Sequence, residues 1–152
     1  MEPVSPLKVN HLPLWLEQFI ETYQKLGTDN LGLLSNIYAK DVVFIDPMHH
    51  ISGFDNLEDY FVSLYTNLTS CTFRVDEVIY KGQDAAIYWT MEYCHPKLNK
   101  NKPVTVQGHS KLRGYRDKVI YHRDYLDLGA MIYEHVPLLG SVVKLIKQRA
   151  NA

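Results

Sequence analysis

The sequence predicts an α+β domain in which a curved antiparallel sheet wraps around N-terminal helices as a cone-shaped roll, followed by a helical C-terminal tail. Apolar residues recur with the period of helices through most of residues 11–68. Over residues 71–127 they follow the alternating period of strands. A run of helices before a run of hairpin-linked strands is typical of helices packed on one face of an antiparallel sheet.

Residues 1–10 are expected to form an extended lead-in to the first helix. The apolar stripe of that helix consists of Leu12, Trp15, Leu16, Phe19, Ile20 and Tyr23. Gly27 ends the helix. Asp29 is placed to cap a short second helix, whose apolar side consists of Leu31, Leu34 and Ile37.

One strand and a third helix complete the N-terminal half. Residues 41–46 are rich in β-branched and aromatic side chains, which favours a strand, and Pro47 closes it. Residues 56–68 carry a helical apolar stripe of Leu57, Tyr60, Phe61, Leu64 and Leu68. Three helices around one short strand can cover the concave face of the sheet and leave a closed-ended pocket.

Four consecutive strands follow, over residues 71–81, 85–95, 104–115 and 118–127. The apolar parity slips between Val75 and Val78, which predicts a β-bulge in the first of them. Residues 96–103 hold three lysines and two asparagines between two prolines, which indicates an exposed loop.

The chain is expected to form one domain, residues 11–127, with residues 128–152 as a helical extension split by Pro137 and Gly140. The last part of this extension is a short basic amphipathic segment, which could bind a membrane surface or a partner. We expect instead a lid over the pocket or an arm that contacts a second copy of the chain.

Composition and charge exclude several classes of protein. The chain has 16 Lys plus Arg against 17 Asp plus Glu, whereas nucleic-acid binding needs a basic excess. No apolar run approaches the roughly 20 residues of a membrane span. Residues 1–10 lack the apolar core of a secretory signal, and two cysteines suit a reducing compartment. We therefore expect a cytoplasmic protein that binds no nucleic acid and makes no membrane contact.

Asp124 is the first candidate for catalysis. Strand alternation places it on one face with Ile120, His122 and Leu126. A carboxylate between apolar neighbours is either desolvated, which suits a general base or acid, or neutralised by a structural partner. His122 is expected to be a hydrogen-bonded neighbour of Asp124.

Glu92 and His109 are the other candidates. Glu92 and Asp124 could share a proton and divide the roles of acid and base, or Glu92 could pair with a basic residue on the rim. His109 could polarise or protonate a substrate oxygen. Its strand has a more apolar face that leaves His109 with Lys111 and Arg113, unless a bulge near Gly108 reverses the parity.

The last strand carries the sequence His122-Arg123-Asp124-Tyr125-Leu126-Asp127. This stretch and the order of elements resemble the nuclear transport factor 2-like superfamily and, within it, SnoaL-like polyketide cyclases and limonene-1,2-epoxide hydrolase. The resemblance covers residues 15–127 and implies a cystatin-like roll. In both families the first aspartate of the stretch is catalytic, which implies that role for Asp124.

Further positions match these families in part. SnoaL-like cyclases have a Gln-x-His pair that points toward the catalytic aspartate, and Gln107 with His109 has that spacing. The water-holding tyrosine and asparagine of the epoxide hydrolase correspond here to Phe44 and Asp46. Its arginine and second aspartate correspond to Thr90 and Glu92. Because the tyrosine and the arginine are replaced, the hydrolase mechanism does not carry over.

No metal or cofactor is expected. Asp46 leads into a loop with His49 and His50, where functional groups often lie. No pair of histidines or cysteines has the spacing of a strong zinc motif, however, and the sequence has no glycine-rich phosphate loop.

Together these residues predict a small enzyme that transfers protons on a small apolar substrate, of isomerase, cyclase or hydrolase type. The candidate catalytic residues are Asp124, His109 and Glu92. The candidate substrate-binding residues are Asp46, Phe44, Tyr88, Thr90, Gln107 and His122.

A non-catalytic module of the same fold, which binds a small molecule or dimerises, is the alternative. In either case we expect a homodimer formed through the outer face of the sheet, where Tyr121, Arg123 and Tyr125 lie.

Overall fold

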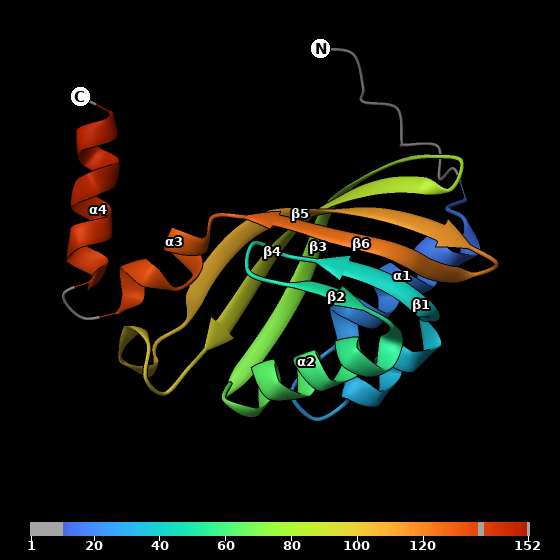
Figure 1. Cartoon of the computed structure of the whole chain (residues 1–152), viewed down its shortest axis with the longest axis horizontal. Coiled ribbons are helices and arrows are strands. Elements are labelled where there is room, and N and C mark those ends of the chain that lie inside the picture. The colour runs from blue at the N-terminus through green and yellow to red at the C-terminus, as the bar shows by residue number, and fades with distance from the viewer. Residues whose placement is uncertain (1–10, 137–138, 152) are drawn as a thin grey trace, which may run out of the picture.

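The computed structural model describes residues 11–136 and 139–151. Its helices and strands are, in chain order, α1 (Leu14–Lys25), the 3-10 helix η1 (Leu31–Asn36), β1 (Tyr38–Ile45), β2 (His50–Ser52), α2 (Phe54–Thr66), β3 (Ser70–Lys81), β4 (Asp84–Cys94), η2 (Asn99–Asn101), β5 (Val104–Tyr115), β6 (Lys118–Leu126), α3 (Leu128–Met131), η3 (Tyr133–His135) and α4 (Leu139–Ala150). The strands form one curved sheet in the order β2-β1-β6-β5-β4-β3, with α1 and α2 against one face (Figure 1). The predicted α+β architecture is confirmed.

Helix α1 forms because its apolar residues follow the helical period, and these residues bury one stripe against the sheet. The buried residues are Trp15, Leu16, Phe19 and Tyr23. The ring of Trp15 packs on Gly114 of β5, where a Cβ would overlap the indole. The absence of a side chain at Gly114 therefore makes room for this ring.

The segment after α1 differs from the prediction in two ways. The second helix is a 3-10 helix whose N-cap is Asn30, and no side chain caps it, so the prediction that Asp29 caps it is wrong. Strand β1 begins at Tyr38 instead of residue 41, since its first residue already pairs with Val119 of β6. Strand β2 was not predicted, because three residues are too few to show a period.

Strands β3 to β6 are joined as three successive antiparallel hairpins. The predicted bulge is confirmed, since the register of β3 against β4 shifts between Val75 and Glu77. The sheet is mixed and not purely antiparallel, because β1 lies parallel to β6. After three reversals of direction, β6 runs opposite to β3 and in the same direction as β1.

The C-terminal extension contains α3, η3 and α4, and α4 stands at one end of the sheet (Figure 1). Lys147 of α4 contacts Asp127 and Glu134 over 2.6 and 3.2 Å. The predicted break at Pro137 lies outside the described residues. The tail is helical in two parts, as predicted, with η3 ending at His135 and α4 beginning at Leu139, so that Gly140 is the second residue of α4.

Candidate functional site

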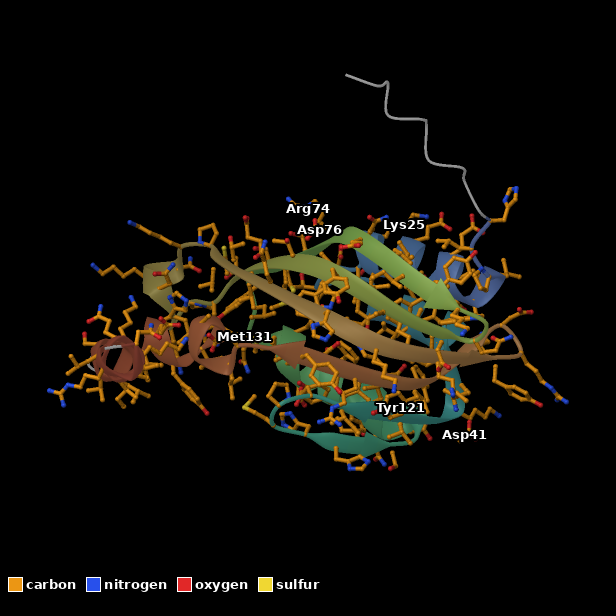
Figure 2. All side chains as sticks on the ribbon, turned by 90° about the horizontal axis from the view of Figure 1, so that it is seen from above. Lys25, Asp41, Arg74, Asp76, Tyr121 and Met131 are labelled. Carbon is orange, nitrogen blue, oxygen red and sulfur yellow. The ribbon has the colours of Figure 1, made fainter. Side chains whose placement is uncertain are left out.

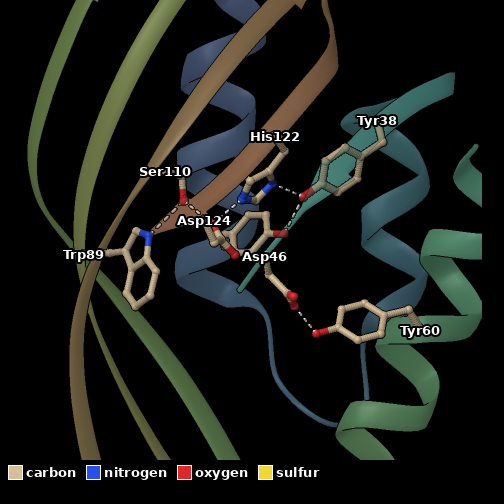
Figure 3. A network of polar contacts seen from close by, with 8 residues as sticks. Tyr38, Asp46, Tyr60, Trp89, Ser110, His122 and Asp124 are labelled. Atoms are coloured by element: carbon tan, nitrogen blue, oxygen red, sulfur yellow. Dashed lines mark hydrogen bonds and ion pairs between the residues drawn. The ribbon is translucent and has the colours of Figure 1, made fainter. Parts of the chain in front are cut away.

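A cavity of about 460 Å³ lies between the sheet and the two N-terminal helices. Side chains of α1, α2, β1, β3 to β6 and α3 line it, and most of them are aromatic or aliphatic. This volume falls in the ~300–1,000 Å³ range of small-molecule sites. Figure 3 shows polar side chains that come together from β1 and the loop after it, α2, β4, β5 and β6.

Strand alternation decides which side chains of the central strands reach the cavity. The pairing of β4 with β5 is unbroken from Asp84 to Tyr93, so no bulge occurs at Gly108. The cavity-lining residues of β4, β5 and β6 include Trp89, Met91, Ser110, His122 and Asp124. A Cβ on Gly108 would lie 2.5 Å from the indole of Trp89, so glycine leaves room for that ring.

Asp124 receives a first chain of hydrogen bonds at its Oδ1 atom (Figure 3). The hydroxyl oxygens of Tyr23 and Tyr38 lie 2.5 Å apart, and that of Tyr38 lies 2.7 Å from Nδ1 of His122. Nε2 of His122 lies 2.6 Å from Oδ1 of Asp124. This series of hydrogen bonds thus connects α1 and β1 to the carboxylate through three buried side chains.

A second chain reaches the same oxygen from β4 and β5. Nε1 of Trp89 donates to Oγ of Ser110 over 2.9 Å, and this hydroxyl donates to Oδ1 of Asp124 over 2.5 Å. Within the described part of the chain, Oδ2 of Asp124 has no hydrogen-bond partner. Since Asp124 lines the cavity and its side chain is 19% exposed, one oxygen is held while the other is open to a ligand.

In both series of hydrogen bonds, each donor can be assigned so that donation runs toward Asp124. Because the indole of Trp89 only donates, Ser110 uses its own hydrogen for Asp124. A neutral His122 with its proton on Nε2 donates to Asp124 and accepts at Nδ1 from Tyr38. Tyr38 accepts in turn from Tyr23. Every hydrogen then points toward Asp124, as an ionised carboxylate requires.

Asp46 is the second carboxylate of the cavity, and both of its oxygens are occupied. Oδ1 accepts from the backbone N–H groups of Met48 and His49 over 2.8 and 2.7 Å, and from Nδ1 of His49 over 3.0 Å. Oδ2 accepts from the hydroxyl of Tyr60 over 2.5 Å (Figure 3). Asp46 therefore organises the loop after β1 and connects it to α2.

The tyrosines around the cavity keep their protons. Burial holds the pKa of Tyr23, Tyr38, Tyr60 and Tyr65 well above its usual range, and the negative charge of Asp124 contributes a smaller increase at each. Their hydroxyls are therefore available as hydrogen-bond donors over the ordinary pH range.

The structure brings four of the predicted site residues together in the cavity, namely Phe44, Asp46, His122 and Asp124. The other five belong to the opposite parity of β4 and β5 and are not among the residues that line the cavity. These are Tyr88, Thr90, Glu92, Gln107 and His109. The expected convergence of Asp124, His109 and Glu92 does not occur, because the unbroken alternation of both strands turns the latter two outward.

On that outer face His109 lies between two tyrosines. Its ring stacks on Tyr88 and Tyr125, with centroids 5.3 and 4.8 Å apart. Thr90 donates to Asp76 over 2.6 Å and accepts from Arg74, and Figure 2 shows these two β3 residues side by side. The outer face thus carries its own aromatic and polar clusters.

The sequence analysis missed several residues of the cavity network. Ser110 could have been found from strand parity, because it shares the apolar face of β5. Tyr23 belongs to the predicted apolar stripe of α1, where a hydroxyl gives no separate signal. Tyr38 lies before the predicted start of its strand, and only the parallel pairing of β1 with β6 brings it to His122.

Two further properties concern the described residues alone. Over residues 11–136 and 139–151, no three His, Cys, Asp or Glu side chains come together as a metal site. In the same ranges, none of the helices has the length and apolar character needed to cross a bilayer.

Comparison with known proteins supports the fold independently. The family model described as a SnoaL-like domain matches residues 16–122, which is most of the chain. No curated protein sequence matches at a significant level.

Three solved structures are similar to this chain. A protein of Catenulispora acidiphila with a ketosteroid isomerase-like fold, in complex with trimethylamine, has a TM-score of 0.70 and 13% identity, and the match covers 82% of this chain and 95% of that one. A protein of Jannaschia sp. CCS1 described as a putative SnoaL-like polyketide cyclase has a TM-score of 0.67 and 13% identity, and the match covers 86% of this chain and 94% of that one. An epoxide hydrolase of M. tuberculosis described as LEH-like gives 0.62 and 14%, with coverage of 77% and 79%. At these identities the likeness concerns the fold.

Proposed function

The chain belongs to the SnoaL-like domain family and has the fold of nuclear transport factor 2-like proteins, and from this premise we propose that it is a cofactor-independent enzyme. Its general base or acid is Asp124, and its substrate is small and largely apolar. The reaction is of isomerase, cyclase or hydrolase type, as in the range of activities named for its structural neighbours.

The observation that supports this proposal most strongly is the asymmetry of Asp124. Oδ1 accepts from Ser110 and His122, whereas Oδ2 of this cavity-lining side chain has no hydrogen-bond partner among the described residues. A base needs a fixed carboxylate with a free lone pair in reach of the substrate. The bonds from Ser110 and His122 fix the carboxylate, and the apolar lining excludes competing water.

The proposed step is a proton transfer. Oδ2 of Asp124 takes a proton from a carbon, or from a water or hydroxyl group that attacks the substrate. The electron pair of the broken bond stays on the substrate or forms the new bond, and the protonated Asp124 then returns the proton at a second position. His122 and Ser110 keep Oδ1 in place throughout.

The experiment uses 5-nitrobenzisoxazole, a neutral aromatic probe that opens to a coloured cyanophenolate when a base removes its C3 proton. A carboxylate in an apolar cavity should catalyse this reaction, and Asp124→Asn should lower kcat/KM by about 100-fold or more, the contribution of a general base. The absorbance of the product measures the rate.

Glu92→Gln is the matched control, because it removes a carboxylate from the outer face of the same sheet. This variant should keep the wild-type rate. Equal rates for Asp124→Asn and the wild type, with both variants folded by circular dichroism, contradict the proposal.

The alternative is a binding module without catalysis. It is favoured by the pairing of Asp124 with His122, since a buried pair can also be purely structural. On this alternative the probe binds, as quenching of tryptophan fluorescence would report, but no variant changes its rate of opening relative to buffer.

We also propose that the protein forms a homodimer through the outer face of its sheet. Tyr88 and Tyr125 are each 39% exposed there, on either side of His109. Large aromatic side chains are enriched in protein interfaces.

The free cysteines Cys71 and Cys94 fit a further proposal, that the protein acts in the reducing cytoplasm.

A further inference from the structure

The charges around the cavity are unbalanced, and we propose that its ligand is an apolar amine bound as the ammonium ion, with its nitrogen beside Oδ2 of Asp124. This inference rests on the proposed function, because the amine would occupy the cavity and the oxygen of the proposed base. It would therefore bind in competition with a substrate whose proton that oxygen removes.

Among the described residues, two carboxylates and no permanent cation line the cavity. Asp46 and Asp124 have side chains only 10% and 19% exposed, so water screens their charges poorly. The described lining residues include neither lysine nor arginine. Both carboxylates accept hydrogen bonds, but the described lining offers them no permanently charged partner. Burying a charge without a counter-charge is unfavourable, and a cationic ligand would supply one.

The three histidines of the lining do not restore the balance. Nδ1 of His95 accepts the backbone N–H of Lys97 over 3.0 Å, as a neutral ring does. His122 fits its network as a neutral ring, with Nδ1 accepting from Tyr38. The ring of His49 packs on Tyr60, and its hydrogen-bond partner is Asp46, so even a charged His49 pairs with Asp46 and not with Asp124.

Nine aromatic side chains line the same space. They are Phe19, Tyr23, Phe44, Tyr60, Phe61, Tyr65, Phe73, Trp89 and Tyr93. The face of an aromatic ring attracts a cation within about 6 Å, most strongly when water is excluded. The rings therefore favour both the charged head and the apolar body of an amine, whereas an anion would meet two carboxylates and the negative faces of the rings.

The negative charge of Asp124 acts on tyrosines on the other side of the cavity. After burial, which is the largest cause, the charge of Asp124 raises the pKa of Tyr23, Tyr60 and Tyr65 further. These residues come from α1 and α2, on the side of the cavity opposite the sheet. The field of Asp124 thus extends across the space that a ligand would occupy.

Oδ2 of Asp124 is the oxygen that an ammonium N–H would reach. Oδ1 is already occupied by His122 and Ser110, as Figure 3 shows. Both oxygens of Asp46 are occupied by donors as well. A protonated tertiary amine brings one N–H, which matches the one free carboxylate oxygen.

The test compares three benzene-based probes of similar size: N,N-dimethylbenzylamine, which is a cation at pH 7, neutral N,N-dimethylbenzamide, and anionic phenylacetate. Titration calorimetry on the full chain should give the amine a Kd at least about tenfold lower than that of the amide, in keeping with a charge-assisted hydrogen bond. Phenylacetate should bind more weakly than both. In Asp124→Asn the amine should lose its advantage while the amide is unaffected, and Glu92→Gln should behave as the wild type.

An amine that binds no tighter than the amide to the wild type overturns the inference, and this comparison needs no variant to fold. Retention of the preference in folded Asp124→Asn overturns it as well. The outcome is separate from that of the proposed function. Turnover of 5-nitrobenzisoxazole that depends on Asp124, without a preference for the amine, leaves the base in place and removes only the ligand class. A preference for the amine without turnover supports the ligand and contradicts the enzyme.

Discussion

At the scale of single residues, the site depends on how a carboxylate and a thiol are buried. Asp124 is predicted correctly to lie beside His122, but its role depends on which of its oxygens is occupied, and only the placement of Ser110 and Tyr38 decides that. Sequence patterns give the face of a strand on which a side chain lies. They do not give the partner that each of its atoms meets.

Cys71 allows a prediction from its surroundings. Burial raises the pKa of this cavity-lining thiol to about 11, and the hydroxyl of Tyr65 offsets a small part of the increase. Alkylation needs the thiolate, so iodoacetamide at pH 8 should modify Cys71 at least about 100-fold more slowly in the folded protein than in urea. The folded-state rate should rise about tenfold for each pH unit up to pH 10.

Mass spectrometry of peptides from the wild type and from Cys71→Ser assigns the modified site. The sign for stability follows from the same pKa, because a thiol whose pKa is raised by folding stabilises the folded state below its unfolded pKa. That contribution is lost as the pH rises toward 11. Equal rates of Cys71 alkylation at pH 8 in the folded and the unfolded protein would contradict this description of the cavity wall.

At the scale of elements, the order of helices and strands was predictable because each long element repeats its apolar period several times. The bulge of β3 followed from a parity slip between Val75 and Val78 for the same reason. The outward direction of His109 was also visible in the parity of β5, and the alternative of a bulge at Gly108 is absent from the unbroken register. Features without a period, such as β2 and the start of β1 at Tyr38, were not predictable, because tertiary pairing creates them.

The packing of α1 on β5 depends on one small residue. Because a Cβ at Gly114 would overlap the indole ring of buried Trp15, Gly114→Ala should lower the free energy of unfolding by about 1–3 kcal/mol through overpacking. Gly32→Ala is the control, since no atom lies within 4 Å of the Cβ that it would add. Urea unfolding followed by circular dichroism measures both, and an equal effect of the two substitutions would refute the close approach of helix and strand.

At the scale of the whole molecule, the sheet separates two surfaces with different chemistry. Its concave face, with α1 and α2, encloses the cavity and the network on Asp124. Its outer face carries the stack of Tyr88, His109 and Tyr125. Of these, His109 had been predicted from the sequence to be a catalytic residue. The residues that resembled a second half of the site therefore lie where a second copy of the chain is proposed to bind.

This separation gives a prediction for the assembly. Light scattering coupled to size-exclusion chromatography should give the mass of a dimer for the wild type. Tyr125→Glu, which places a charge at one end of the aromatic stack, should give the mass of a monomer, because an unpaired charge in an interface is costly. Val62→Glu on α2 is the matched control, since Val62 is 48% exposed on an element that covers the other face. It should remain dimeric.

The same variants connect assembly to the site. Since the cavity is lined within one copy of the chain, the monomeric Tyr125→Glu variant should keep its affinity for N,N-dimethylbenzylamine within about twofold, the scatter expected for distant, independent positions. If the Tyr125→Glu variant remains dimeric, the interface lies on another surface of the molecule. A monomeric variant that loses the amine would mean that the second copy supports the wall of the cavity through β6, the strand on which both Tyr125 and Asp124 lie.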